Sequence, residues 1–364
     1  MPQPVPTADV ISATASEPAP GTAVVEPPEL PSFRTLYWEV SEFLPSQPPP
    51  PDGKPVPGTR EHALEVAALL ANAERSVTVE PTIGLPPVAD QSTSESGDDA
   101  RGSVADFLLG GAVAAYWPAI QDLDRYRRLN TPEAPYPARN VDLWELYALS
   151  RVNDELLRPF QGLAPDEDAE TVPWLTAGAY LDFWQALGFT RIGDRPYSPF
   201  HHEIVEVEEA VDADEITVAH TFWPGLMFGD LLFSRAGVRV RCRPGVLDPK
   251  LATSSTLYWT FRRERRPTMD RSVGWGHNSQ WRTDFRCDYE EADRFWFNVH
   301  GDRDLGGMEI PYRPRDPDEG LSLAERRELL IHRSFVAARV EGHGDYSPYS
   351  YTLSVAKAPP SWPH

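Results

Sequence analysis

Hydrophobic positions recur with a helical period in the first half of the chain and alternate with polar positions in the second half. Large apolar residues recur at intervals of three or four positions, which is typical of the buried face of a helix. They are Tyr180, Phe183, Trp184 and Leu187. From Phe200 onward, apolar and polar residues alternate along several short segments, which is typical of half-buried strands. The order of the two patterns predicts an α+β protein.

Local signals set the boundaries of the predicted helices. Asn140 is a favourable N-cap for a helix over residues 141–157, and Pro118 should kink or divide a helix over residues 104–129. Ser322 and Glu325 have the spacing of a capping box, which predicts a helix from there to about residue 340. Two further helices are predicted over residues 60–75 and, after Thr171 and Pro173, up to Gly188.

The alternating segments predict seven or eight short strands between residues 200 and 356. After the first two strands, the predicted strands cover residues 226–234, 238–243, 257–263, 278–289, 295–299 and 349–355. Short connections of this kind are typical of an antiparallel β-sandwich or a barrel-like sheet. We therefore expect a helical region, residues 61–195, to pack on an antiparallel β region, residues 196–364.

The first 60 residues differ in composition from the rest of the chain. Fifteen prolines precede Gly58, so this segment is predicted to be a Pro-rich, disordered tail. Residues 33–44 interrupt the tail with a run that is too apolar to stay free in water. We expect this run to dock on the folded protein as an added strand or a short helix.

Residues 199–223 have the clearest hairpin pattern, with an acidic turn near Asp212. If the two strands pair symmetrically about this turn, Glu203 lies opposite His220, and His201 shares the same inner face. Two imidazoles and a carboxylate are a common ligand set for Zn²⁺ or non-haem iron. The same residues also fit a structural Glu–His hydrogen bond, and a one-residue change of register would separate them.

A second candidate site lies in the predicted strand over residues 278–289 and just before it. His277 is a candidate general base, and Arg282 is a candidate group for binding the reacting molecule. Arg282 and Arg286 could together clamp a small anionic ligand through its carboxylate or phosphate. The alternative is a solvated sheet face with cross-strand ion pairs.

Charge and cysteine content limit the classes of partner. With 55 acidic and 34 basic residues, the formal net charge is −21, which argues against nucleic acid or an anionic membrane as the main partner. Cys242 and Cys287 match no zinc or redox motif, and two buried thiols are expected. The N-terminus has no pattern of a signal peptide, so a cytoplasmic location is expected.

The sequence contains no phosphate-binding loop, nucleophile elbow or dinucleotide fingerprint. This absence favours a binding or accessory protein that acts through protein–protein contacts. The alternative is an enzyme in which His201, Glu203 and His220 hold a divalent metal.

Overall fold

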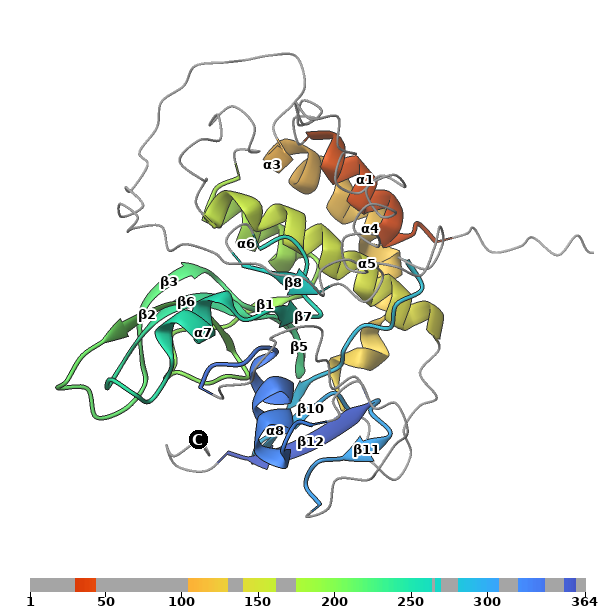
Figure 1. Ribbon diagram of the computed structural model, residues 1–364. Coiled ribbons are helices and arrows are strands. Elements are labelled where there is room, and N and C mark those ends of the chain that lie inside the picture. The colour runs from red at the N-terminus through yellow and green to blue at the C-terminus, as the bar shows by residue number, and fades with distance from the viewer. Residues whose placement is uncertain are drawn as a thin grey trace, which may run out of the picture. The chain divides into compact units, whose positions relative to one another are not determined.

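The computed structural model describes residues 30–43, 104–129, 140–161, 175–263, 266–269, 281–307, 320–337 and 350–357. Helices and strands both occur in these ranges, and the strand pairs are mostly antiparallel (Figure 1). The prediction of a mixed α+β protein is confirmed. The predicted helix over residues 60–75 and most of the Pro-rich tail lie outside the described residues.

Most helices precede the strands in the chain. They are α1 (Phe33–Phe43), α3 (Val104–Phe107), the π-helix η1 (Leu108–Ala112), α4 (Val113–Asp122), the 3₁₀-helix η2 (Asp124–Arg127), α5 (Asn140–Leu156), the 3₁₀-helix η3 (Arg158–Phe160) and α6 (Ala177–Ala186). The helix predicted over residues 141–157 is confirmed as α5. The segment 104–129 is not divided at Pro118, which lies inside α4, but at the π-helix, where Gly110 and Gly111 weaken the α-helical preference.

Helix α6 has the buried stripe that its sequence predicts. Tyr180, Phe183, Trp184 and Leu187 are all fully buried. The helix begins after Thr176, whose side chain accepts a hydrogen bond from the amide of Ala179. Residues 171–174, where an earlier start was predicted, lie outside the described residues.

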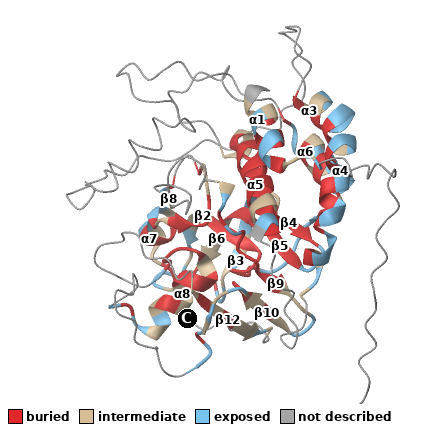
Figure 2. Cartoon of the chain, turned by 90° about the vertical axis from the view of Figure 1, so that its right-hand side faces the viewer, coloured by how far each residue is buried: buried red, intermediate tan, exposed pale blue. Residues whose placement is uncertain are grey.

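Helix α1, in the segment predicted to dock, packs along α5 (Figure 1). The Glu145 carboxylate of α5 accepts hydrogen bonds from Ser32 Oγ at 2.8 Å and from the amide of Phe33 at 2.8 Å. The negative charge thus lies at the N-terminus of α1, where the helix dipole favours it. Figure 2 shows that α5 is buried along most of its length, while the outer faces of α3 and α4 are exposed.

A seven-stranded sheet lies against these helices. Its order is β1 (Thr190–Arg191), β4 (Leu226–Phe228), β5 (Leu231–Ser234), β9 (Tyr289–Glu290), β10 (Arg294–Phe297), β12 (Tyr351–Ala356) and β11 (Arg303–Asp304). Leu231 and Phe233 share a core with α5 and α6, whereas Leu232, between them, shares a core with residues of α8 (Leu323–His332). Because successive side chains of a strand point to opposite faces, helices cover both faces of β5.

A second sheet contains β2 (His202–Glu209), β6 (Ala236–Cys242) and β3 (Thr217–Trp223), in that order. Strand β6 pairs in parallel with β2 and antiparallel with β3. Helix α7 (Pro249–Ser254) packs against β2, and β7 (Leu257–Tyr258) pairs with β8 (Thr268–Met269). The described strands do not close into a barrel, so the barrel-like alternative is wrong, and the sandwich stays a prediction.

The strand predicted over residues 278–289 is wrong for residues 281–288. Phe285 and Cys287 are buried, but so are Arg286 and Asp288, so the alternation does not separate core from solvent. The Phe285 amide donates to the carbonyl of Leu143 in α5 instead of to a neighbouring strand. The alternation of apolar and polar residues does not mark a strand here, because residues of both kinds are buried.

The capping box of α8 is confirmed, because Ser322 and Glu325 each bind the other's backbone amide. The predicted extension to residue 340 is wrong. The helix ends at His332, and Arg333 follows in the left-handed conformation with φ of 61°. The two cysteines are buried and unpaired, as predicted. Among the described helices, none is both long enough and apolar enough to cross a membrane.

Candidate ligand cleft and a buried arginine network

The predicted pairing of the first two strands is wrong, because β6 lies between β2 and β3. Glu203 is opposite Gly237, and His220 is opposite Arg239, both on β6. The facing side chains of β2 and β6 have complementary charges. Glu206 of β2 forms an ion pair with Arg239 at 2.6 Å, so the acidic strand pairs with the basic one.

The three predicted metal ligands consequently lie in different surroundings. The Nε2 atom of buried His201 is 3.0 Å from Glu290 and 2.6 Å from an Arg195 nitrogen. Glu203 is bound by Arg263, and His220 is exposed on β3. Within the described ranges, no group of three His, Cys, Asp or Glu side chains could hold a metal ion. The zinc or iron cofactor stays a prediction that no described contact supports.

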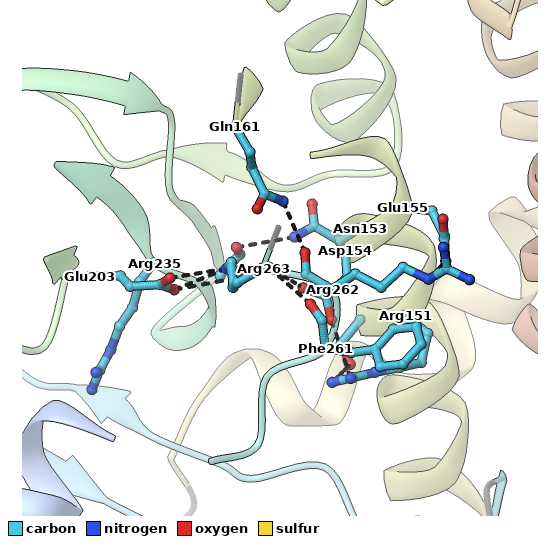
Figure 3. A network of polar contacts seen from close by, with 12 residues as sticks. Arg151, Asn153, Asp154, Glu155, Gln161, Glu203, Arg235, Phe261, Arg262 and Arg263 are labelled. Atoms are coloured by element: carbon cyan, nitrogen blue, oxygen red, sulfur yellow. Dashed lines mark hydrogen bonds and ion pairs between the residues drawn. The ribbon is translucent and has the colours of Figure 1, made fainter. Parts of the chain in front are cut away.

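Glu203 belongs to a buried network centred on Arg263 (Figure 3). Arg263 Nε donates to Glu203 at 3.0 Å, and Nη1 donates to Asp154 of α5 at 2.9 Å. Arg151 forms an ion pair with the other oxygen of Asp154 at 3.3 Å. Burial raises the pKa of Asp154, and the two guanidinium groups oppose this shift. The network therefore joins α5 to the start of β2.

The neighbouring residue in α5 extends this network toward α1. Glu155 is fully buried and lies 2.7 Å from Arg262 Nε, and it accepts a hydrogen bond from Tyr37 at 3.2 Å. Burial raises the pKa of Glu155, and the Arg262 and Arg158 cations oppose this shift. Adjacent acids of one helix thus bind to two adjacent arginines of the segment after β7. These contacts assign the network a structural role.

The second predicted site is not assembled as a surface clamp. Arg282 is exposed and lies 5.8 Å from the ring centre of Trp144. Arg286 is buried, with hydrogen bonds to Asp288 at 2.8 Å and to the carbonyl of Leu330 at 2.7 Å. His277 lies outside the described residues. Arg286 is therefore occupied by internal contacts, and the anionic ligand at Arg282 and Arg286 stays a prediction that no described contact supports.

A cleft of about 400 Å³ lies where β1 and the following loop meet the three-stranded sheet. Arg191, Asp194 and Arg195 line it from β1 and the loop, and His202 and His220 line it from β2 and β3. This volume is in the range of small-molecule sites. The cleft thus brings together two guanidinium groups and two imidazoles, and we take it as the candidate functional site.

Contacts with buried groups hold one of the two arginines in place. Arg195 contacts His201 at 2.6 Å and Glu290 at 3.3 Å, and Lys357 binds the other oxygen of Glu290 at 2.9 Å. Arg191 is half-exposed, and its nearest carboxylate oxygen, of Asp194, lies 3.9 Å away. Arg191 is therefore the more available of the two cations.

Burial keeps His202 neutral at physiological pH. Desolvation and the adjacent His201 lower the pKa of His202 to about 4. Its Nδ1 atom accepts a hydrogen bond from the Ser198 amide at 3.0 Å. An uncharged imidazole can donate or accept hydrogen bonds without adding charge to the cleft.

Sequence reasoning gave one cleft residue, His220, a different functional role and assigned no functional role to the others. His220 was predicted as a metal ligand, but the loop over residues 191–195 was placed in no element. A usable signal was present, since two arginines and a glycine lie between a helix end at Gly188 and the paired histidines at 201 and 202. A search for apolar–polar alternation does not detect functional loops of this kind.

Comparisons with known proteins gave no family model, no curated relative and no solved structure that matches this chain.

Replacing Arg263 by Met should lower the free energy of unfolding by about 3–5 kcal/mol, because two buried carboxylates lose their shared cation. Urea denaturation measures this loss. The matched control is Arg243→Met, whose side chain is 56% exposed and pairs with Asp214 at the surface, with an expected cost below about 1 kcal/mol. Equal costs for the two variants would contradict the proposed role of the network.

The lowered pKa of His202 predicts a pH dependence of stability. The pKa of His202 is about 4 in the folded protein and 6.5 for an ordinary histidine. Between these two pH values the imidazole is protonated in the unfolded chain but not in the folded one, so the free energy of unfolding rises with pH across this interval. The rise amounts to about 3 kcal/mol, because each pKa unit corresponds to about 1.4 kcal/mol. His202→Asn keeps an acceptor for the Ser198 amide but cannot titrate.

We expect the His202→Asn variant to have a flatter stability profile than the wild type from pH 4 to 6.5, measured by urea denaturation at each pH. Thr221→Asn, an exposed substitution in the same cleft, is the control and should keep the wild-type slope. Parallel profiles for wild type and His202→Asn would contradict the assignment.

Proposed function

We propose that this chain is a binding protein that holds a small anionic ligand in the cleft of Arg191 and Arg195. The observation that carries the proposal is the position of two arginines in a cleft of ligand size, in a chain whose net charge is −21. Guanidinium groups bind carboxylates and phosphates through paired hydrogen bonds. These two cations outnumber Asp194, the one carboxylate among the described residues that line the cleft, and so favour a ligand of negative charge.

The neighbours of Arg195 support a preformed site. The contacts to His201 and Glu290 restrict its guanidinium group before a ligand arrives, and this lowers the entropy lost on binding. Arg191, with its exposed side chain, can then close on the ligand from the edge. His220 and Thr221 on β3 provide polar groups for the uncharged part of the ligand.

Binding is favoured over catalysis because the described cleft residues show no nucleophile hydrogen-bonded to a base. The metal-dependent enzyme with His201, Glu203 and His220 stays a prediction, and their separate surroundings give it no support. We propose a cytoplasmic location for the protein. The two buried, unpaired cysteines fit a reducing compartment.

Isothermal titration calorimetry with citrate and adenosine monophosphate tests the proposal on the full chain. These probes present carboxylates and a phosphate. We expect at least one of them to bind, and Arg191→Gln to weaken that binding about tenfold, which corresponds to 1.4 kcal/mol for a charged hydrogen-bonded contact. Arg191 is suitable because, within the described ranges, its guanidinium group forms no ion pair with a buried side chain, and its ion-pair partner Asp194 is exposed.

The matched control is Arg243→Gln, at the far end of β6, which should bind the probe as the wild type does. If Arg191→Gln and Arg243→Gln have equal affinities, the cleft is not the binding site. If neither probe binds at millimolar concentration, an anionic ligand of this size is excluded.

The sequence favours a protein partner without placing it on these helices, and we propose that such a partner binds the exposed face of η1 and α4. Leu109 and Trp117 are 44% and 38% exposed, and the sequence from Phe107 to Gln121 contains no charged residue. Asp106 and Asp122 flank this run. An apolar surface bordered by acids suits a partner with an apolar centre and basic edges.

Trp117→Glu should abolish co-purification of such a partner, because it places a charge within the apolar contact. Val211→Glu is the control, since Val211 is 84% exposed and lies far along the chain in the turn after β2. Affinity purification of both variants, followed by circular dichroism to check the fold, measures the difference. Equal recovery of the same proteins with both variants would exclude this face as an interface.

A further inference from the structure

A second, smaller cavity lies inside the arginine network. Its volume of about 30 Å³ has room for one or two species the size of a water molecule. The side chains that line it come from α5, the start of β2, the end of β5 and the segments after β7 and α8. The charged ones are Arg151, Arg235, Arg263, Arg333, Asp154 and Glu203.

The carboxylates that line this cavity are already matched by cations. Arg263 binds both Glu203 and Asp154, and Arg151 binds the second oxygen of Asp154. Two positive and two negative charges therefore compensate one another on this side of the cavity. Glu203 and Asp154 therefore do not compensate the positive charge of the other arginines at the cavity.

The other side of the cavity carries an excess of positive charge. Arg286 and Arg333 share Asp288, at 2.8 and 3.1 Å, and all three residues are buried. Arg235 is 4% exposed and forms no ion pair with a carboxylate of the described residues. Among the described residues, these three buried guanidinium groups thus have one carboxylate, that of Asp288, to compensate their charge.

Helix α8 supplies only part of the missing negative charge. Arg235 donates to the carbonyls of Ile331 at 2.6 Å and His332 at 2.8 Å, and Arg286 donates to Leu330. The C-terminus of a helix is equivalent to about half a negative charge. More than one positive charge is therefore left without compensation, and burial together with the Arg333 cation lowers the pKa of Arg235 to about 9.

Two hydrogen-bond donors at this cavity also have no acceptor. The Nε–H groups of Arg235 and Arg333 are buried and have no partner among the described residues, and both side chains line the cavity. A buried donor without an acceptor costs about 1–3 kcal/mol. An anion in the cavity would supply the acceptor and the charge together.

We propose that this cavity binds one small monovalent anion of the size of chloride, held by Arg235 and Arg333. The anion would lie between the C-terminal end of α8 and the β5–β6 connection, and it would stabilise the contact between them. This site is separate from the ligand cleft, and neither proposal depends on the other.

Bromide replaces chloride in such sites and can be located in a crystal by its anomalous scattering. We expect an anomalous peak in the cavity of wild-type crystals soaked in sodium bromide. Thermal unfolding of the full chain should also shift upward with chloride concentration, relative to sodium acetate at equal ionic strength, because only the folded state binds the anion. A cavity that contains water and no bromide peak would overturn the proposal.

Variants separate this site from general salt effects. Arg235→Met removes a donor and one surplus cation, so the chloride-dependent rise in melting temperature should disappear. Arg243→Met, an exposed arginine, should keep it. A chloride dependence that persists in Arg235→Met would overturn the proposal, and if that variant does not fold, the bromide experiment on the wild type decides.

Discussion

The Arg263 guanidinium group, bound to one carboxylate of α5 and one of β2, is the contact on which the rest of the structure depends. Removing three charged groups from water is costly, and only close, nearly complete pairing offsets that cost. Asp154 and Glu203 supply the pairing from two different elements. The position of the three-stranded sheet relative to the helices is therefore set by a directional polar contact as well as by apolar packing, which has little orientational preference.

This anchor also positions the ligand cleft. Glu203 lies directly after His201 and His202, so the contact with Arg263 fixes the start of β2 and the imidazoles beside it. His201 in turn contacts Arg195 and Glu290, which belongs to the other sheet. The polar contacts of Glu203 and of His201 are thus joined by the short backbone segment between these two residues, which connects the buried network to the cation at the cleft. Rigid support of this kind limits the loss of entropy when a ligand binds.

The sequence predicted local features better than long-range ones. The stripe of α6, the boundaries of α5 and the capping box of Ser322 and Glu325 depend on residues within a few positions of one another, and each appears in the structure. The pairing of β2 with β6 depends on residues more than thirty positions apart, and the alternation of residues 199–223 fits a hairpin equally well. The ion pair of Glu203 with Arg263 joins residues 60 positions apart, and no spacing rule reveals it. Arg286 and Asp288 are two positions apart, so their shared face follows from spacing, but nothing in the sequence indicates that this face is buried. Buried charged residues therefore account for the errors at Glu203 and Arg286.

The central place of β6 in its sheet has a consequence for how the protein is made. A ribosome-bound chain that ends before Ala236 contains both outer strands, β2 and β3, but not the strand that joins them. The native ladder that β6 forms with both strands cannot be completed until Cys242 has left the exit tunnel, and unpaired strand edges favour association between chains. The acidic residues along β2, with Glu206, Glu208 and Glu209 in close succession, repel neighbouring nascent chains during that interval.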